Sequence, residues 1–296
     1  MKLKLIALAA MLAAGSAQAK VADSNDNGNT GSGDMFASLV SVSNNASYTV
    51  DLGLRLDQFT AASALVNADG VKLVWDLDAG TFADLSAVST GLGAQMQTLN
   101  YGSVYTTFAT AAVAGASDLK FDVKAMDGLP ASFATAGANR YLSTSAANSI
   151  TATNGQVFVM DNVDVYPTAA NIDATNSTHG TDFNIAGANM FDAGDATNVY
   201  FQNGSKDNWN GATSFTSTGS TGNELSFYAL TNSSTTAASQ ATVVKYAGVW
   251  SFDVATAQLS YATAAAAVPE AETYAMMLAG LGLMATVARR RKAKQA

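Results

Sequence analysis

The sequence contains no cysteine, and this absence excludes several classes of protein. Without thiols the chain forms no disulfides and uses neither a thiol nucleophile, an iron–sulfur cluster nor a zinc site with cysteine ligands. A chain of 296 residues without disulfides must be held together by a hydrophobic core, and 48% hydrophobic residues are ample for one.

Histidine is nearly as scarce, since His179 is the only one in the sequence. One imidazole in a polar stretch provides neither a histidine-rich metal site nor an ordinary partner for a serine nucleophile. We interpret His179 as a solvated or capping loop residue. The sequence therefore predicts a protein that is not an enzyme, with no catalytic residue and no cofactor.

Positive charge is scarce between the two ends of the chain. The sequence has 15 Lys and Arg and 23 Asp and Glu; setting aside two lysines in residues 1–19, and five cations and two glutamates in residues 269–296, leaves 8 cations and 21 anions. So acidic a body repels phosphate backbones, which excludes nucleic acid as a partner. It favours solubility and the binding of divalent cations.

The first residues have the composition of a secretory signal peptide. Lys2 and Lys4 precede an apolar run over residues 5–14, and small residues then stand at Ala17 and Ala19. This order predicts a signal helix over residues 1–19, export by the Sec machinery, and cleavage after Ala19.

The last residues, 268–296, combine three features in a fixed order. A short motif of Val268, Pro269 and Glu270 comes first, and a cytoplasmic stop of Arg289, Arg290 and Arg291 comes last. Between them an uncharged run over residues 274–288 predicts a single transmembrane helix, about 22 Å long against a hydrocarbon core of about 30 Å. The anchor residues are Tyr274, Ala275, Met276, Met277, Leu278, Ala279, Gly280, Leu281, Gly282, Leu283 and Met284. The basic cluster predicts that the tail crosses the inner membrane with its arginines in the cytoplasm.

This tail resembles the PEP-CTERM sorting signal of exported bacterial proteins, with Ala271 where a second proline usually stands. The resemblance implies processing by exosortase, a membrane protease, and delivery to the cell surface or an exopolysaccharide matrix after transient anchoring. Similar tails also carry an ice-binding label, which by itself implies no activity. Four body segments resemble uncharacterised exported PEP-CTERM proteins and imply no assigned activity: residues 75–77, 178–180, 207–209 and 225–231.

The body shows many short runs in which apolar and polar residues alternate. Such runs cover residues 48–57, 71–78 and 118–125, and later 225–230, 242–246, 249–254 and 258–261. A period of two predicts strands. With loops rich in Ser, Thr, Asn and Gly, the pattern predicts a mainly β protein, an antiparallel, jelly-roll-like β-sandwich with few short helices.

The predicted organisation has five parts. After the signal peptide come a flexible polar leader (20–35), the β-sandwich body (36–263), a spacer (264–267) and the sorting tail (268–296). Within the body, residues 86–99 favour a helix, although two glycines weaken it. Residues 156–166 favour one bent strand or two, and residues 199–201 a short one.

The polar leader contains the spacing of a calcium loop. Asp23, Asn25 and Asn27 alternate, Gly28 follows, and Asp34 stands at the twelfth position. The usual glutamate at that position is absent, and Asn/Asp/Gly-rich sequence produces such spacings by chance. Two interpretations stay open: a calcium site, or a flexible leader.

Two further functions stay open for the body. Trp209 lies in a polar stretch with Asn and Asp, which suits a carbohydrate-binding module, whereas Trp75 and Trp250 fall on strand patterns and are predicted to be core. A hydrolase would need facing carboxylates. The candidate pairs are Asp76 with Asp78, predicted to share the solvent face of one strand, and Asp161 with Asp164.

Overall fold

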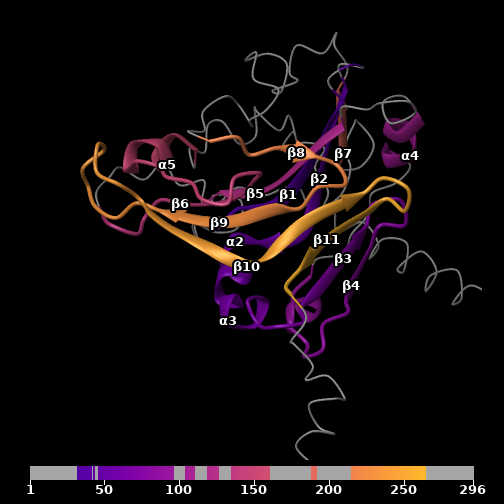
Figure 1. Cartoon of the computed structure of the whole chain (residues 1–296), viewed down its shortest axis with the longest axis horizontal. Coiled ribbons are helices and arrows are strands. Elements are labelled where there is room, and N and C mark those ends of the chain that lie inside the picture. Colours follow the sequence, from indigo (N-terminus) through magenta and orange to yellow (C-terminus); the bar gives the residue numbers. More distant parts are fainter. Residues whose placement is uncertain are drawn as a thin grey trace, which may run out of the picture. The chain divides into compact units, whose positions relative to one another are not determined.

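The computed structural model describes residues 32–41, 43, 46–96, 104–110, 119–126, 135–160, 188–191 and 215–264 (Figure 1). The signal peptide, residues 20–31 of the polar leader, His179, Trp209 and the sorting tail lie outside these residues. The chain divides into two compact units, Met1–Ala264 and Ala265–Ala296. Only the first contains described residues.

The described elements are mostly strands. They are β1 (Asp34–Ser41), β2 (Ala46–Arg55), β3 (Lys72–Asp76), β4 (Thr81–Asp84), β5 (Leu119–Met126), β6 (Arg140–Ser145), β7 (Ala188–Phe191), β8 (Gly219–Ser220), β9 (Leu225–Thr231), β10 (Thr242–Asp253) and β11 (Gln258–Ala262). The helices are short: α2 (Leu56–Ala61), α3 (Ser63–Val66), the 3₁₀ helix η1 (Leu92–Ala94), α4 (Val104–Phe108) and α5 (Asn154–Met160). The prediction of a mainly antiparallel β protein with few short helices is confirmed.

The alternating patterns correspond to strands with one face in the core. In β2 the side chains of Tyr48, Val50 and Leu52 are buried in the main cluster. Residues 242–246 and 249–254, predicted as two strands, fall largely in one long strand, β10. Trp75 and Trp250 are both fully buried, so their prediction as core residues is confirmed.

The described strands form one sheet rather than the two sheets of a jelly-roll-like sandwich. Its order is β4-β3-β11-β10-β9-β6-β5-β1-β2-β7, with β8 beside β5. Yet the Trp75 indole N–H on β3 donates a hydrogen bond of 2.9 Å to the Leu52 carbonyl on β2, seven places away in that order. The sheet therefore curls until distant strands touch, and one strongly curved sheet encloses the core that two sheets would enclose in a sandwich.

A bulge in β10 contributes to this curvature. Pairing with β9 is interrupted between Lys245 and Val249, and Figure 1 shows β10 as a long strand with a marked bend. Gly248 lies in the bulge, where its N–H donates to the Tyr261 hydroxyl at 3.1 Å. That hydroxyl in turn donates to the Val66 carbonyl at 3.2 Å. A Cβ at position 248 would lie 2.2 Å from the Tyr261 ring.

Gly248→Ala is expected to lower the free energy of unfolding by about 1–3 kcal/mol, because the Tyr261 ring is buried and must shift out of its packing. Chemical denaturation of the purified protein measures this. Gly93→Ala is the matched control, since a Cβ there meets only the Phe82 ring at an ordinary 3.6 Å. Equal stability of the two variants would show that the bulge tolerates a side chain.

Aromatic rings from the strands and from α2 fill the inner face of the sheet. The Phe59 ring of α2 contacts the Phe227, Tyr246 and Tyr261 rings at centroid distances of 5.5, 5.4 and 5.5 Å. The Trp75 and Trp250 rings lie 5.2 Å apart. A smaller cluster, including Phe36, Tyr141 and Val157, lies on the opposite face, where α5 contributes Val157.

Two predicted elements are wrong within the described residues. The segment predicted to be a strand from residue 156 is instead part of the helix α5. The Thr153 N–H donates to the Gln156 side chain at 2.8 Å and the Gln156 N–H to the Thr153 hydroxyl at 3.3 Å. This reciprocal cap starts a helix, and the Thr-x-x-Gln spacing signals it in the sequence.

The helix predicted over residues 86–99 reduces, within the described part of that segment, to the three residues of η1. Gly91 precedes it with φ of 74°, a left-handed conformation that a continuous α-helix cannot contain. The Asp84 carboxylate accepts hydrogen bonds from the Ser86 and Thr90 N–H groups, at 3.1 and 2.8 Å. These bonds hold the backbone in a loop.

Candidate functional site

Most residues singled out from the sequence lie outside the described structure. These are the sorting motif, the anchor, the arginines, Ala17, Ala19, Trp209, Asp161, Asp164 and three of the calcium-loop residues. The fourth of those, Asp34, is the buried first residue of β1 and pairs in register with Arg55 of β2. The calcium loop thus stays a prediction. The described helices include none long and apolar enough to cross a membrane.

Asp76 and Asp78 do not share one face of a strand, which corrects that prediction. Asp76 is the last residue of β3, and Asp78 lies beyond it in the turn before β4. The Asp76 carboxylate accepts hydrogen bonds from the Asp78 and Ala79 N–H groups, at 3.1 and 2.8 Å. The first aspartate therefore shapes the turn that presents the second.

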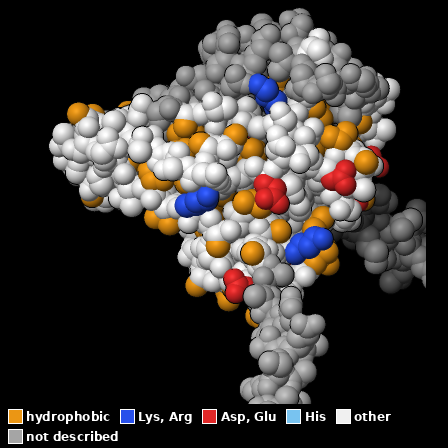
Figure 2. Space-filling model, viewed as in Figure 1, with side chains coloured by type: hydrophobic (Ala, Val, Ile, Leu, Met, Phe, Trp, Pro, Cys, Tyr) orange, Lys and Arg blue, Asp and Glu red, His pale blue; other side chains and the backbone are white. Residues whose placement is uncertain are grey.

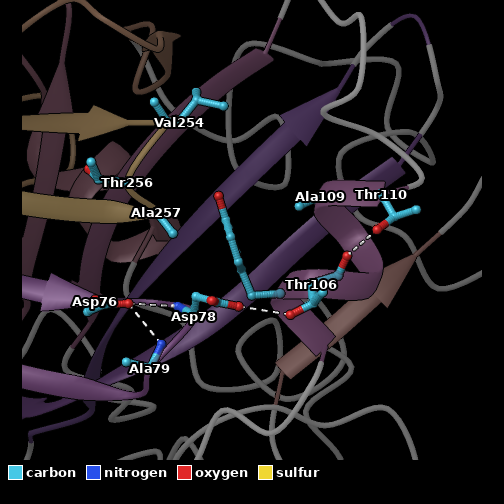
Figure 3. A pocket seen from close by; sticks show the side chains of 11 residues that line it. Asp76, Asp78, Ala79, Thr106, Ala109, Thr110, Val254, Thr256 and Ala257 are labelled. Atoms are coloured by element: carbon cyan, nitrogen blue, oxygen red, sulfur yellow. Dashed lines mark hydrogen bonds between the residues drawn. The ribbon is translucent and has the colours of Figure 1, made fainter.

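This turn forms one wall of a pocket of about 440 Å³. The helix α4 with the residues after it forms a second wall, and the turn between β10 and β11 a third (Figure 3). The lining residues are Asp76, Asp78, Ala79, Tyr105, Thr106, Ala109, Thr110, Val254, Ala255, Thr256 and Ala257. We refer to this hollow as the β3–α4 pocket.

Two hydrogen bonds hold the walls of the β3–α4 pocket together. The Thr106 hydroxyl of α4 donates to the Asp78 carboxylate at 2.8 Å, as Figure 3 shows. The Leu77 N–H donates to the Ala257 carbonyl at 3.0 Å and so joins the first and third walls. Segments far apart in the chain are thereby held at fixed positions around the hollow.

Tyr105 is the most unusual residue of the pocket. Only 4% of its surface is exposed, and its ring packs edge-on against Tyr48 and Phe252, at 5.7 and 6.4 Å between centroids. No described residue hydrogen-bonds to its hydroxyl. Burial, followed by the carboxylates of Asp78, Asp253 and Asp76, raises the pKa of Tyr105 to about 12. The phenol is therefore neutral at physiological pH.

A buried ion pair lies on the face of β5 opposite the main core cluster. The Lys124 ammonium donates to the Asp122 carboxylate, and both side chains are fully buried. Burial lowers the pKa of Lys124, and the Asp122 charge opposes that effect only in part. The Ser217 hydroxyl also reaches Asp122, at 3.5 Å. Since the two charges compensate each other within a buried network, we assign the pair a structural role.

Positive charge is dispersed over the described residues on the face shown in Figure 2. Figure 2 shows the described Lys and Arg side chains of the face in view as separate spots, without a continuous basic patch. Among the described residues, no three Asp, Glu or His side chains come together closely enough to hold a metal ion. Of the pockets formed by the described residues, the β3–α4 pocket is the one lined by both Asp76 and Asp78.

Sequence reasoning identified Asp76 and Asp78 but missed the residues that turn their surroundings into a pocket. Tyr105 and Thr106 stand in a low-charge stretch without a clear period of two, where neither strand nor helix was predicted. In the sequence, α4 is indicated only by the spacing of Tyr105 and Phe108, which are three residues apart and so share one face of a helix. Both side chains are buried in the structure.

Comparison with known proteins identifies the tail. Residues 267–292 match the family model of the PEP-CTERM protein-sorting motif. The match covers the tail alone and does not extend to the body segments that resemble other exported proteins. Searches of curated proteins and of solved structures gave no match. The predicted sorting signal is confirmed: residues 267–292 carry the PEP-CTERM protein-sorting motif.

Proposed function

We propose that the chain is a non-enzymatic exported protein whose body becomes part of the cell surface or the exopolysaccharide matrix. It enters the export pathway through the Sec machinery, pauses in the inner membrane on its tail, and is released when exosortase cleaves near Pro269 and Glu270. The observation that carries this proposal is the PEP-CTERM protein-sorting motif at residues 267–292.

The composition of the body supports this destination. It has no cysteine, so its stability does not depend on the redox state of its surroundings. Its acidic surface suits a protein that must stay soluble outside the membrane. The described core consists of a large, aromatic-rich cluster on the inner face of the curved sheet and a smaller cluster on the opposite face.

Deletion of residues 268–296 is expected to abolish delivery to the surface and matrix, because the chain then lacks the segment that holds it for the protease. Immunoblots of inner-membrane, surface and matrix fractions from producing cells measure this. Unchanged surface or matrix delivery of the truncated chain would contradict the proposal.

A double substitution separates recognition from anchoring. Pro269→Ala with Glu270→Ala leaves the apolar run and the arginines in place, so the chain is expected to accumulate uncut in the inner membrane. Intact mass spectrometry distinguishes the uncut form from the released one. Glu272→Ala is the matched control because it removes a nearby charge outside the predicted motif, and we expect normal processing.

A further inference from the structure

We propose that one end of the body, the end from which the chain continues toward its tail, rests on the lipid bilayer while the tail is anchored there. The inference rests on the proposed anchoring of the tail and adds an interaction surface on the body itself. Two observations support it: exposed apolar side chains gather at this end, and the length of the connecting chain keeps this end near the membrane.

Few large apolar side chains are exposed on the described part of the body. They are Leu65, Leu85, Val88 and Val244, with exposed fractions of 46, 59, 70 and 54%. Leu65 belongs to α3, whereas Leu85 and Val88 follow β4. Single exposed apolar residues are ordinary on a protein surface, but a group of them marks a binding surface.

Hydrogen bonds bring the first three of these side chains to one short segment, residues 68–72. The bonds run from the Ala68 N–H to the Leu65 carbonyl at 3.1 Å, from the Leu85 N–H to the Lys72 carbonyl at 2.8 Å, and from the Ala87 N–H to the Gly70 carbonyl at 3.1 Å. Val88 follows Ala87 directly in the chain. We refer to the surface formed by Leu65, Leu85 and Val88 around residues 68–72 as the exit surface.

The chain leaves the described body beside the exit surface. The Gly70 N–H donates to the Ala264 carbonyl at 2.9 Å, and the Thr263 hydroxyl donates to the Ala68 carbonyl at 2.7 Å. In Figure 1, α3 and the segment after β11 lie at the lower end of the described body. Ala264 is the last described residue, so the exposed apolar side chains surround the point from which the chain continues toward the sorting tail.

The connecting chain is too short to hold the exit surface far from the membrane. Nine residues, 265–273, separate Ala264 from the apolar run that begins at Tyr274. Each residue advances a chain by at most about 3.6 Å, so the connection reaches no more than about 35 Å. Apolar side chains held this close to a bilayer leave water when they enter its interfacial region, and this favours contact.

The charge near the exit surface does not oppose this contact. Residues 61–72 and 85–96 contain one anion, Asp69, and one cation, Lys72, and are therefore neutral together. The body as a whole has 8 cations and 21 anions, so its other surfaces are repelled by anionic lipids. A second copy of the chain could also cover an apolar surface, but the bilayer is the partner that the connection to the tail keeps within reach.

Fluorescence quenching in vesicles tests the proposal, and the absence of native cysteine allows a probe to be attached at one chosen site. The chain with its tail uncut is reconstituted in phosphatidylcholine vesicles, with a nitrobenzoxadiazole probe on Val88→Cys. Val244→Cys is the matched control, since Val244 is similarly exposed but stands on β10 beside Ala229 of β9. Lipids with a nitroxide on the acyl chain should quench the Val88→Cys probe at least about threefold more than the control, and added salt should not weaken this apolar contact.

A further variant tests whether the neighbouring side chains hold the contact. In the Val88→Cys chain, Leu65→Ser together with Leu85→Ser is expected to reduce the quenching about threefold or more, because the exit surface loses two of its three large apolar side chains. Both residues are exposed, so the body is expected to stay folded, and circular dichroism of each chain verifies this.

Flotation of the vesicles distinguishes failure of the proposal from failure of the proposed function. A chain that does not float with the vesicles is not anchored by its tail, and this result would overturn both. For a chain that floats, equal quenching at the two sites, or quenching at neither, would overturn the bilayer contact alone. A blue shift of the Val88→Cys probe that grows with protein density, without quenching by the lipids, would assign the surface to a second copy and would also overturn the bilayer contact.

Discussion

Trp75→Ala is expected to lower the free energy of unfolding by about 3–5 kcal/mol, the largest effect of any single substitution considered for this protein. Trp75 is fully buried and packs at a tilt against Trp250 and Phe82, at 5.2 and 4.8 Å between ring centroids. Its indole N–H also bonds the Leu52 carbonyl across the curled sheet. Alanine therefore leaves a large cavity and an unpaired carbonyl at the contact between β3 and β2.

Trp75→Phe separates these two contributions. Phenylalanine keeps most of the ring packing but has no donor for Leu52, so we expect a smaller loss of about 1–3 kcal/mol. Denaturant titrations followed by circular dichroism measure both variants. Leu85→Ala, at a side chain that is 59% exposed, is the control and should stay within about 0.5 kcal/mol of wild type. A loss for Trp75→Ala no larger than this control would show that the Trp75 contact does not hold the sheet in its curled form.

Raising the pH above about 10.5 is expected to destabilise the body steeply. Burial raises the pKa of Tyr105 and of Tyr246 to about 12. It raises the pKa values of Tyr48, Tyr141 and Tyr261 as well. Above its ordinary pKa of 10.0, each of these tyrosines has lost its proton in the unfolded chain and keeps it in the folded one. The unfolded state then binds fewer protons, so stability falls as pH rises, by about 1.4 kcal/mol per pH unit for each such tyrosine.

The titration of Lys124 changes the stability in the opposite direction, at lower pH. Its pKa in the folded protein lies below the ordinary 10.5, so the folded state releases that proton first and stability rises with pH up to about that value. The tyrosine effect therefore stands alone above pH 10.5. Denaturant titrations between pH 8 and pH 12, with tyrosinate absorbance as a second signal, measure both effects.

Tyr48→Phe provides the control for the alkaline effect. The Tyr48 hydroxyl is buried without a hydrogen-bond partner, so its loss costs little at pH 8. The variant should lose stability less steeply above pH 10.5, by about 1.4 kcal/mol per pH unit, because one titrating group is gone. Stability that stays constant from pH 10.5 to pH 12 would contradict the prediction.

Local patterns were sufficient for most of the strands. Residues 48–57 alternate clearly because Tyr48, Val50 and Leu52 on one face of β2 enter the main apolar cluster. The residues on the other face, Thr49 and Asp51, are also buried but polar. Such patterns fail where capping decides the structure. Thr153 and Gln156 start α5 through two hydrogen bonds, in a segment whose β-branched and aromatic residues favour a strand.

The architecture required information that no local pattern contains. Two facing sheets and one curled sheet both need strands with one apolar face, so alternation alone does not distinguish them. The difference depends on the β10 bulge and on the contact between Trp75 and Leu52. The first lies in the pairing of two consecutive strands, β9 and β10, and the second joins residues 23 positions apart on β3 and β2, so both depend on contacts between different elements.

The sequence by itself determined the sorting signal, because such a signal is read as a linear order of motif, apolar run and arginines. It also determined that the body is built of antiparallel strands around an apolar core. Only the tertiary structure decided that Tyr105 meets Asp76 and Asp78 around one pocket. The helix α4 and the turn after β3 are separate in the chain, and the curled sheet fixes how they approach each other.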